Sequence, residues 1–212
     1  MQGFGVDPAV LPAFALAMVM IELTPGPNLA YLALLGASRG HGSGLRAVAG
    51  ITTGLAAWLL VTLFGLTRTP LFSQTGLEIM RWIGGGYMLW LAYDAVRPAP
   101  RPSPGQMPGA QPFLRGLAAN LLNPKAAIFY LVLLPGFIKP EVGPVFLQVL
   151  ILGAIHIAIS IIVHSAAVFG AAEAASRITP SWAFGFRVIL ALGLLASTLW
   201  LLVIPISLEA AT

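Results

Sequence analysis

The 212-residue chain contains no cysteine, and only 8% of its residues are charged. The absence of cysteine excludes disulfides, thiolate metal sites and thiol redox chemistry, including thiol-based electron transfer across a membrane. Soluble domains contain roughly 25% charged residues, whereas this chain is 58% hydrophobic with a mean hydropathy of +0.91. The composition therefore predicts an all-α integral membrane protein without a soluble catalytic or nucleic-acid-binding domain.

Basic residues are also missing before Arg39, where the only charged residues are Asp7 and Glu22. A cleaved signal peptide needs a positive N-terminal region, so the first apolar run is expected to be retained as a span. Since a span needs about 20 apolar residues, the chain predicts six transmembrane helices, at about residues 8–35, 45–66, 77–96, 113–138, 144–169 and 186–206. A glycine-rich loop, 36–44, is expected after the first span, and a short loop with Glu173 and Arg177 after the fifth.

Residues 98–112, PAPRPSPGQMPGAQP, contain six prolines and almost no large apolar side chain. This composition is typical of a semi-extended linker rather than of a helix. The chain is therefore expected to divide into a first three-helix repeat, residues 1–97, and a second, residues 113–212.

Helix-breaking motifs interrupt the first and fourth spans. The first motif is Thr24-Pro25-Gly26-Pro27-Asn28, and the second is Asn123-Pro124-Lys125. Each places a capping residue before a proline, a pattern that indicates the start of a new helix. We therefore expect two half-helices in each of these spans, with the second half of span one starting at Pro25. Half-helices whose N-termini lie near the membrane midplane are typical of transporter binding sites.

The distribution of basic residues predicts the orientation, because Lys and Arg are enriched in cytoplasmic loops. Seven lie on the side of loops one–two, three–four and five–six, and three lie on the other side (Arg39, Arg46, Arg97, Arg101, Arg115, Arg177 and Arg187, against Arg68, Arg81 and Lys139). Both termini are expected outside the cell and the proline-rich linker in the cytoplasm. Three spans in each half would invert the second repeat relative to the first.

Four segments occur in a specific order and spacing: TPGPN at 24–28, AGITTGLAAW at 49–58, RWIGGGYMLWLAYDAVR at 81–97 and FLRGLAANLLNPKAAIFYLVLLPGFI at 113–138. Together they resemble the lysine exporter (LysE/RhtB-type) family of bacterial inner-membrane amino-acid exporters. The resemblance covers about residues 10–205. It implies six helices and secondary active export of amino acids or small amino-acid-like zwitterions by proton antiport. Expected partners are the amino acid, protons and the lipid bilayer, with a homodimer left open and no nucleic acid.

Charged residues inside a membrane are functional by default, and Lys125 and Glu22 are the two deepest in the spans. We expect Lys125 to receive the substrate carboxylate and Glu22 to lie near the substrate ammonium and take part in proton coupling. Pairing of Lys125 with Glu22 in the empty carrier is an alternative. Many family members carry an acidic residue where Ser160 stands here, which indicates that the coupling carboxylate has moved to Glu22.

The remaining candidate residues are polar side chains near the two breaks and on span five. His156, Ser160 and His164 recur every four residues and should lie along one stripe. His156 and Ser160 are assigned to proton coupling, with a helix-to-helix hydrogen bond as the alternative for His156. His164 is expected to be structural. The full substrate-binding set comprises Thr24, Pro25, Gly26, Pro27, Asn28, Asn120, Asn123, Pro124 and Lys125, with capping as the alternative for Asn123.

Other functions fit the sequence less well. No HExxH motif supports an intramembrane enzyme, and GASRG at 36–40, which has the GxSxG spacing, lies in an expected loop between two helices and not at the strand-to-helix elbow of a hydrolase. A metal-ion exporter would need several convergent carboxylates, and only Glu22 lies deep in a span. We expect no catalytic residues, bound metal or cofactor. Export of another small metabolite or ion on the same fold remains an alternative.

Overall fold

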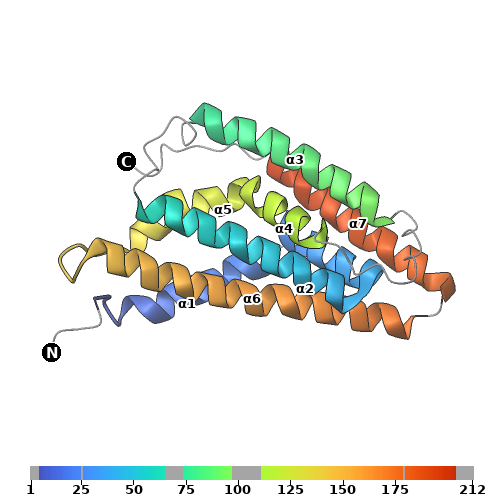
Figure 1. Cartoon of the computed structure of the whole chain (residues 1–212), viewed down its shortest axis with the longest axis horizontal. Coiled ribbons are helices and arrows are strands. Elements are labelled where there is room, and N and C mark those ends of the chain that lie inside the picture. The colour runs from blue at the N-terminus through green and yellow to red at the C-terminus, as the bar shows by residue number, and fades with distance from the viewer. Residues whose placement is uncertain (1–4, 25, 65–73, 97–110, 179, 204–212) are drawn as a thin grey trace.

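The computed structural model describes residues 5–24, 26–64, 74–96, 111–178 and 180–203, and these residues are almost entirely helical (Figure 1). The α-helices are α1 (Val10–Leu23), α2 (Pro27–Leu63), α3 (Gln74–Val96), α4 (Gln111–Leu121), α5 (Pro124–Ile128), α6 (Val145–Arg177) and α7 (Pro180–Val203). A π-helical turn, η3 (Phe129–Leu133), and a 3-10 turn, η4 (Leu134–Phe137), continue α5. The all-α class expected from the sequence is confirmed.

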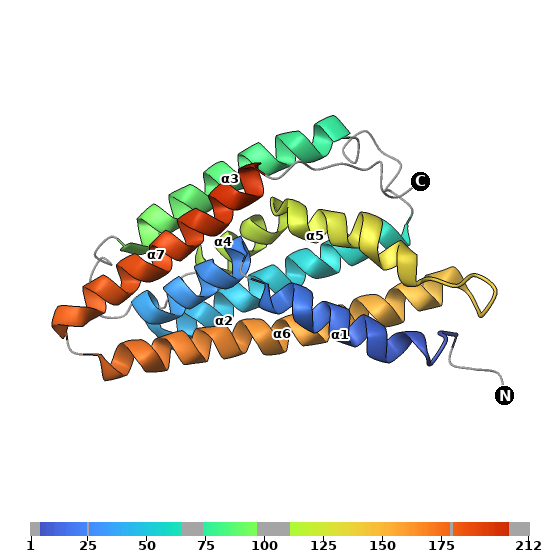
Figure 2. The ribbon, with the colours of Figure 1, turned by 180° about the vertical axis from the view of Figure 1, so that it is seen from behind.

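The helix α2 consists of two arms that meet at Gly40. This residue has φ 77° and ψ 178° inside an otherwise helical run, a conformation that residues with a side chain rarely adopt. The chain reverses direction there (Figures 1 and 2). The predicted loop over 36–44 was therefore wrong in extent, because only Gly40 leaves helical geometry. Gly36 and Gly44 remain helical and lie against Val168 of α6, where an added Cβ would overlap that residue.

Other helices extend beyond the apolar segments from which their ends were predicted. Helix α6 continues to Arg177, and Arg177 pairs with Glu173 at 2.8 Å on its last turns, where a loop was predicted. Helix α7 begins at Pro180 instead of residue 186, and α4 already begins at Gln111, inside the predicted linker. The rest of that linker lies outside the described residues. Terminal helical turns tolerate polar residues, so hydropathy alone ends helices too early.

The helices are arranged in three groups (Figures 1 and 2). Helices α3 and α7 lie side by side, α1 and α6 lie on the opposite side, and α2, α4 and α5 run between them. Gly50 and Gly54 of α2 lie at a close helix contact, because an added Cβ there would overlap the backbone of Phe113 and the side chain of Asn120, respectively. Small residues at these places let α2 and α4 approach closely.

Two helices among the described residues are long and apolar enough to cross a membrane: α2, with its turn at Gly40, and α6. Helix α1 and residues 184–200 of α7 are shorter apolar segments. The count of six spans and the inverted relation of the two halves stay predictions.

The segment before α1 is fixed to the connection between η4 and α6. The Lys139 ammonium donates to Asp7 Oδ2 at 2.7 Å, and the buried Gln148 amide bonds to the backbone N and O of Lys139 and to the Gly143 carbonyl. The hydrogen bond with Lys139 lowers the pKa of Asp7, and the same bond raises the pKa of Lys139. The start of α1 and the connection between η4 and α6 lie toward one end of the molecule, and the turn between the two arms of α2 lies toward the other (Figures 1 and 2).

Candidate functional site

The first break separates α1 from α2. Thr24 ends α1, and both its backbone N and its hydroxyl bond to the carbonyl oxygen of Met20, at 3.0 and 2.7 Å. Gly26 is the extended N-cap residue of α2, and Pro27 takes the first helical position. The predicted start at Pro25 was therefore two residues early, and Pro25 itself lies outside the described residues. The N–H groups of Asn28 and Leu29 belong to the first turn and have no partner within the helix.

The second break separates α4 from α5 and matches the prediction. Asn123 is the N-cap residue, its side-chain oxygen accepts from Lys125 N at 3.0 Å, and Pro124 takes the first helical position. The backbone N of Ala126 also bonds to Asn123 O at 3.1 Å. The first turn of α5 is thus already satisfied, whereas Asn28 N and Leu29 N of α2 have no hydrogen-bond partner among the described residues. Pro27 and Pro124 therefore occupy equivalent positions, which places Asn28 and Lys125 in equivalent positions as well.

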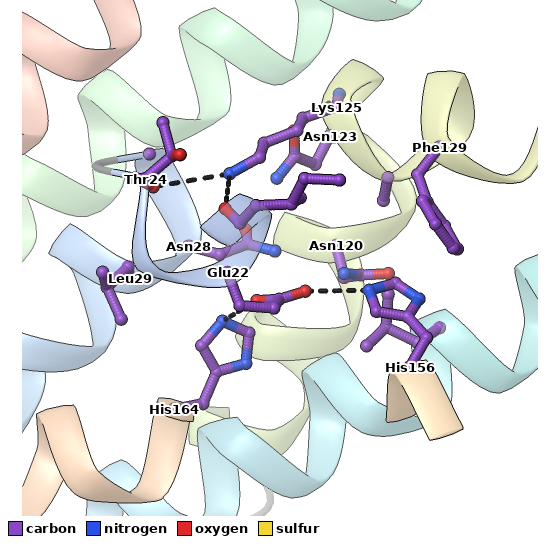
Figure 3. A pocket seen from close by; sticks show the side chains of 14 residues that line it. Glu22, Thr24, Asn28, Leu29, Asn120, Asn123, Lys125, Phe129, His156 and His164 are labelled. Carbon is purple, nitrogen blue, oxygen red and sulfur yellow. Dashed lines mark hydrogen bonds and ion pairs between the residues drawn. The ribbon is translucent and has the colours of Figure 1, made fainter. Parts of the chain in front are cut away.

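One cavity lies between the two breaks (Figure 3). Its volume of about 30 Å³ corresponds to about two water molecules. An amino acid therefore does not fit in the cavity of this structure. The lining residues are Ile21, Glu22, Thr24, Gly26, Asn28, Leu29, Leu55, Asn120, Asn123, Lys125, Ala126, Phe129, His156 and His164.

Lys125 reaches from α5 to the end of α1. Its ammonium donates to the carbonyl oxygens of Ile21 and Thr24, at 2.6 and 3.4 Å. These carbonyls are among the last of α1, where the helix dipole favours a cation. A Cβ added to Gly26 would lie 3.6 Å from the same ammonium. Lys125 thus joins the second half of the chain to the break in the first half.

Glu22 is held by two histidines of α6 and not by Lys125 (Figure 3). Its Oε1 lies 2.9 Å from His156 Nε2, and its Oε2 lies 3.1 Å from His164 Nε2. The sequence-based pairing of Glu22 with Lys125 was therefore wrong for this state. The two groups have different partners because helix α6, distant in sequence, packs against α1.

The stripe predicted on α6 is confirmed, with His156, Ser160 and His164 all at most 3% exposed. Ser160 Oγ lies 3.0 Å from His164 Nδ1, so a hydrogen-bonded chain runs from Ser160 through His164 and Glu22 to His156. Sequence reasoning assigned His164 to structure and missed it as a site residue. The spacing of eight residues between the histidines was the available signal, because it places both on one helix face.

Aromatic rings cover the other side of His156. The ring centroids of Phe129 and Tyr130 lie 4.0 and 5.6 Å from that of His156. Both aromatic residues belong to the π-helical turn η3, and such turns are frequent at functional sites. Three polar atoms beside the cavity are buried without a hydrogen-bond partner in the described structure: Asn28 Oδ1, Asn120 Oδ1 and His156 Nδ1.

The structure brings together every described residue of the predicted substrate set except Pro27 and Pro124, which form the helix starts behind the cavity. Ser160 is not among the lining residues, but its hydroxyl contacts the ring of His164, which does line the cavity. Within the described residues, no group of three or more acidic, histidine or cysteine side chains is arranged to hold a metal ion.

Comparison with known proteins identifies the family. Residues 19–204 match the LysE type translocator family. The chain belongs to the LysE type translocator family. It is similar to the homoserine/homoserine lactone efflux protein of Salmonella typhimurium, with 30% identity over 90% of this chain and 92% of the relative. The threonine efflux protein of Escherichia coli is 29% identical over 61% of this chain and 66% of its own length.

A further relative of this LysE type translocator is described only as a membrane protein. It comes from Vibrio cholerae and is 29% identical over 74% of this chain and 78% of its own length. No solved structure matches the chain. The family and the named relatives are transporters, which confirms the sequence-based classification as a membrane transporter rather than an enzyme.

Proposed function

We propose that this LysE type translocator exports small neutral amino acids across the bacterial inner membrane in exchange for protons. The observation that carries the proposal is the cavity between two helix breaks, where a partly buried cation and a partly buried anion bond, among the described residues, to separate groups of the protein. Relatives named for homoserine and threonine efflux support a small amino-acid substrate.

The contacts inside the cavity suggest where a zwitterion binds. Each charged side chain is bonded to a protein group that a charged group of the substrate could replace. The Lys125 ammonium donates to the carbonyls of Ile21 and Thr24, and it can instead donate to a substrate carboxylate. The N–H groups in the first turn of α2, next to Gly26, can supply further donors for that carboxylate. The Glu22 carboxylate accepts hydrogen bonds from the imidazoles of His156 and His164, and it can instead accept them from the substrate ammonium.

A neutral side chain fits this arrangement better than a cationic one. Glu22 is the one acidic side chain lining the described cavity, and the substrate ammonium uses it. A lysine or arginine side chain would remain without a counter-ion in a partly buried site, which is costly. The amides of Asn28 and Asn120 can instead bond to a hydroxyl group of the substrate.

We also propose six spans in two inverted repeats, with both termini in the periplasm and the proline-rich linker in the cytoplasm. The packing of the two halves supports this proposal. Helix α1 of the first half packs on α6 of the second, and, equivalently, α4 of the second half packs on the second arm of α2 in the first. The last helices of the two halves, α3 and α7, pack on each other. Both broken helices resume at an N-cap residue followed by proline, Gly26-Pro27 and Asn123-Pro124. Rocking of one repeat against the other would expose the cavity to each side in turn.

The test is a thermal-shift screen of the purified protein, since a ligand that binds the folded state raises its melting temperature. L-homoserine, L-threonine and L-serine should each raise it, whereas L-lysine and 4-hydroxybutyrate, which lacks the amino group, should not. Proteoliposomes loaded with the best ligand should then export it faster when a proton gradient is imposed. No melting shift with any of the three amino acids would refute the proposal.

A further inference from the structure

The two histidines that hold Glu22 differ at their second ring nitrogen. A carboxylate oxygen can only accept a hydrogen bond, so each imidazole must donate its Nε2–H to Glu22. His164 Nδ1 lies 3.0 Å from the hydroxyl of Ser160, whereas His156 Nδ1 is buried without a partner in the described structure. Because each ring must direct Nε2 at Glu22, neither can flip without losing this contact.

His164 is fully hydrogen-bonded in both protonation states because its partner is a hydroxyl group. A hydroxyl carries one donor and two acceptor sites, and its hydrogen rotates. When His164 is neutral, the Ser160 hydroxyl donates to the bare Nδ1. When Nδ1 carries a proton, the same oxygen accepts from it. The change of state therefore needs only rotation of one hydroxyl hydrogen.

His156 has no such partner. Its Nδ1 faces a buried environment in which the ring of Phe129 lies 4.0 Å from the imidazole centroid. A proton added there would create a charged N–H without an acceptor, and a buried, unsatisfied donor of this kind is strongly unfavourable. The structure therefore favours a neutral His156 that only orients Glu22.

We propose that His164 is the residue that binds and releases the exchanged proton, that the Ser160 hydroxyl switches between donor and acceptor to permit this, and that His156 stays neutral. This inference rests on the proposed proton exchange. It reverses the sequence-based assignment, in which His156 was the coupling histidine and His164 was structural.

The proton balance of this step is simple. One proton adds to Nδ1 of the neutral imidazole and the same proton later leaves it, and no other bond is made or broken. The imidazolium neutralises Glu22 when no substrate is bound, and the substrate ammonium neutralises it when the proton has left. The other ionisable groups facing this cluster are Lys125 of α5 and Tyr130 of η3, while α2 and α4 contribute the uncharged Asn28 and Asn120. One proton is thus exchanged for one zwitterion.

The chain's three histidines make a direct test feasible. The full chain, labelled with ¹⁵N-histidine and reconstituted in lipid nanodiscs without substrate, is titrated by NMR, with His41→Gln, His156→Gln and His164→Gln used to assign the signals. His164 Nδ1 should gain a proton as the pH is lowered. His156 should keep a protonated Nε2 and a bare Nδ1 throughout. Titration of His156 with a static His164 would overturn the proposal.

Variants of Ser160 test whether its hydroxyl permits the protonation of His164 or is only a structural contact. In Ser160→Ala the charged imidazole loses a stronger hydrogen bond than the neutral one, so the His164 midpoint should fall. Ser160→Thr keeps the hydroxyl and should restore the midpoint. An unchanged or raised midpoint in Ser160→Ala would contradict the switch, and if that variant does not fold, the wild-type titration decides. Because no substrate is present, the result is independent of whether amino acids bind.

Discussion

The Lys125 ammonium lies 2.6 Å from the carbonyl oxygen of Ile21, a residue 104 positions earlier in the chain. Next to this carbonyl, Glu22 is bound by His156 and His164 of α6. The last turn of α1 is therefore held from two sides, by a cation on α5 and by two imidazoles on α6. Substrate carboxylate and substrate ammonium would each compete with one of these contacts, so binding and release of α1 are expected to be linked.

Replacement of Lys125 by methionine should abolish tight substrate binding. A hydrogen bond to a charged group contributes about 1.5–3 kcal/mol, so affinity should fall roughly tenfold to a hundredfold. Lys125→Arg should not restore it, because the guanidinium is wider and planar. Isothermal titration with L-homoserine measures the change. Lys139→Met, which removes a cation from the Asp7 contact outside the site, serves as the control, and equal affinities in Lys125→Met and this control would disprove the carboxylate role.

Glu22 and His164 should be energetically coupled, whereas Glu22 and Lys139 should not. Residues that share a hydrogen bond typically show coupling of about 0.5–3 kcal/mol in double-mutant cycles, while distant residues add within about 0.5 kcal/mol. The cycle uses Glu22→Gln and His164→Gln, with Glu22→Gln and Lys139→Met as the comparison. The free energy of unfolding in denaturant is the measurement. Additive effects in the first cycle would argue against the contact.

Gly50 should be far less tolerant of alanine than Gly42, although both belong to α2. A Cβ at Gly50 would overlap the backbone of Phe113 in α4, whereas nothing lies within 4 Å of a Cβ at Gly42. Overpacking typically costs about 1–3 kcal/mol, so Gly50→Ala should lower the melting temperature clearly. Gly42→Ala should leave it unchanged or raise it slightly, since alanine favours a helix. Equal melting temperatures of the two variants would contradict the close approach of α2 and α4.

The proposed orientation can be tested by single cysteines, because the natural chain has none. Glu141 and Gly42 are both exposed. Glu141 belongs to the connection between η4 and α6 and Gly42 follows the turn of α2, and these two segments lie toward opposite ends of the molecule (Figures 1 and 2). In intact cells, a membrane-impermeant maleimide should label Glu141→Cys and not Gly42→Cys. After the cells are opened, both should react. The reverse pattern in intact cells would invert the orientation.

Local sequence rules predicted the helix breaks well where one residue decides the geometry. The sequence Asn123-Pro124 contains one proline and therefore allows one position for the helix start, and α5 begins at that position. In the first motif two prolines can each take the first helical position, and the rule did not distinguish them. The choice of Pro27 depends on the extended backbone of Gly26, next to which the Lys125 ammonium lies. Likewise, the glycine-rich run 36–44 suggested a loop, but Gly36 and Gly44 are glycines because they pack against Val168.

The sequence by itself determined the helical class, the family, the two breaks and the polar stripe on α6, because hydropathy, proline chemistry and helical spacing act over a few neighbouring residues. Only the tertiary structure decided which charges meet. Glu22 and Lys125 have opposite charges, yet Glu22 binds His156 and His164, while Lys125 binds backbone carbonyls. That choice depends on how α5 and α6 pack against the end of α1, and contacts between residues more than a hundred positions apart follow from packing that no local pattern records.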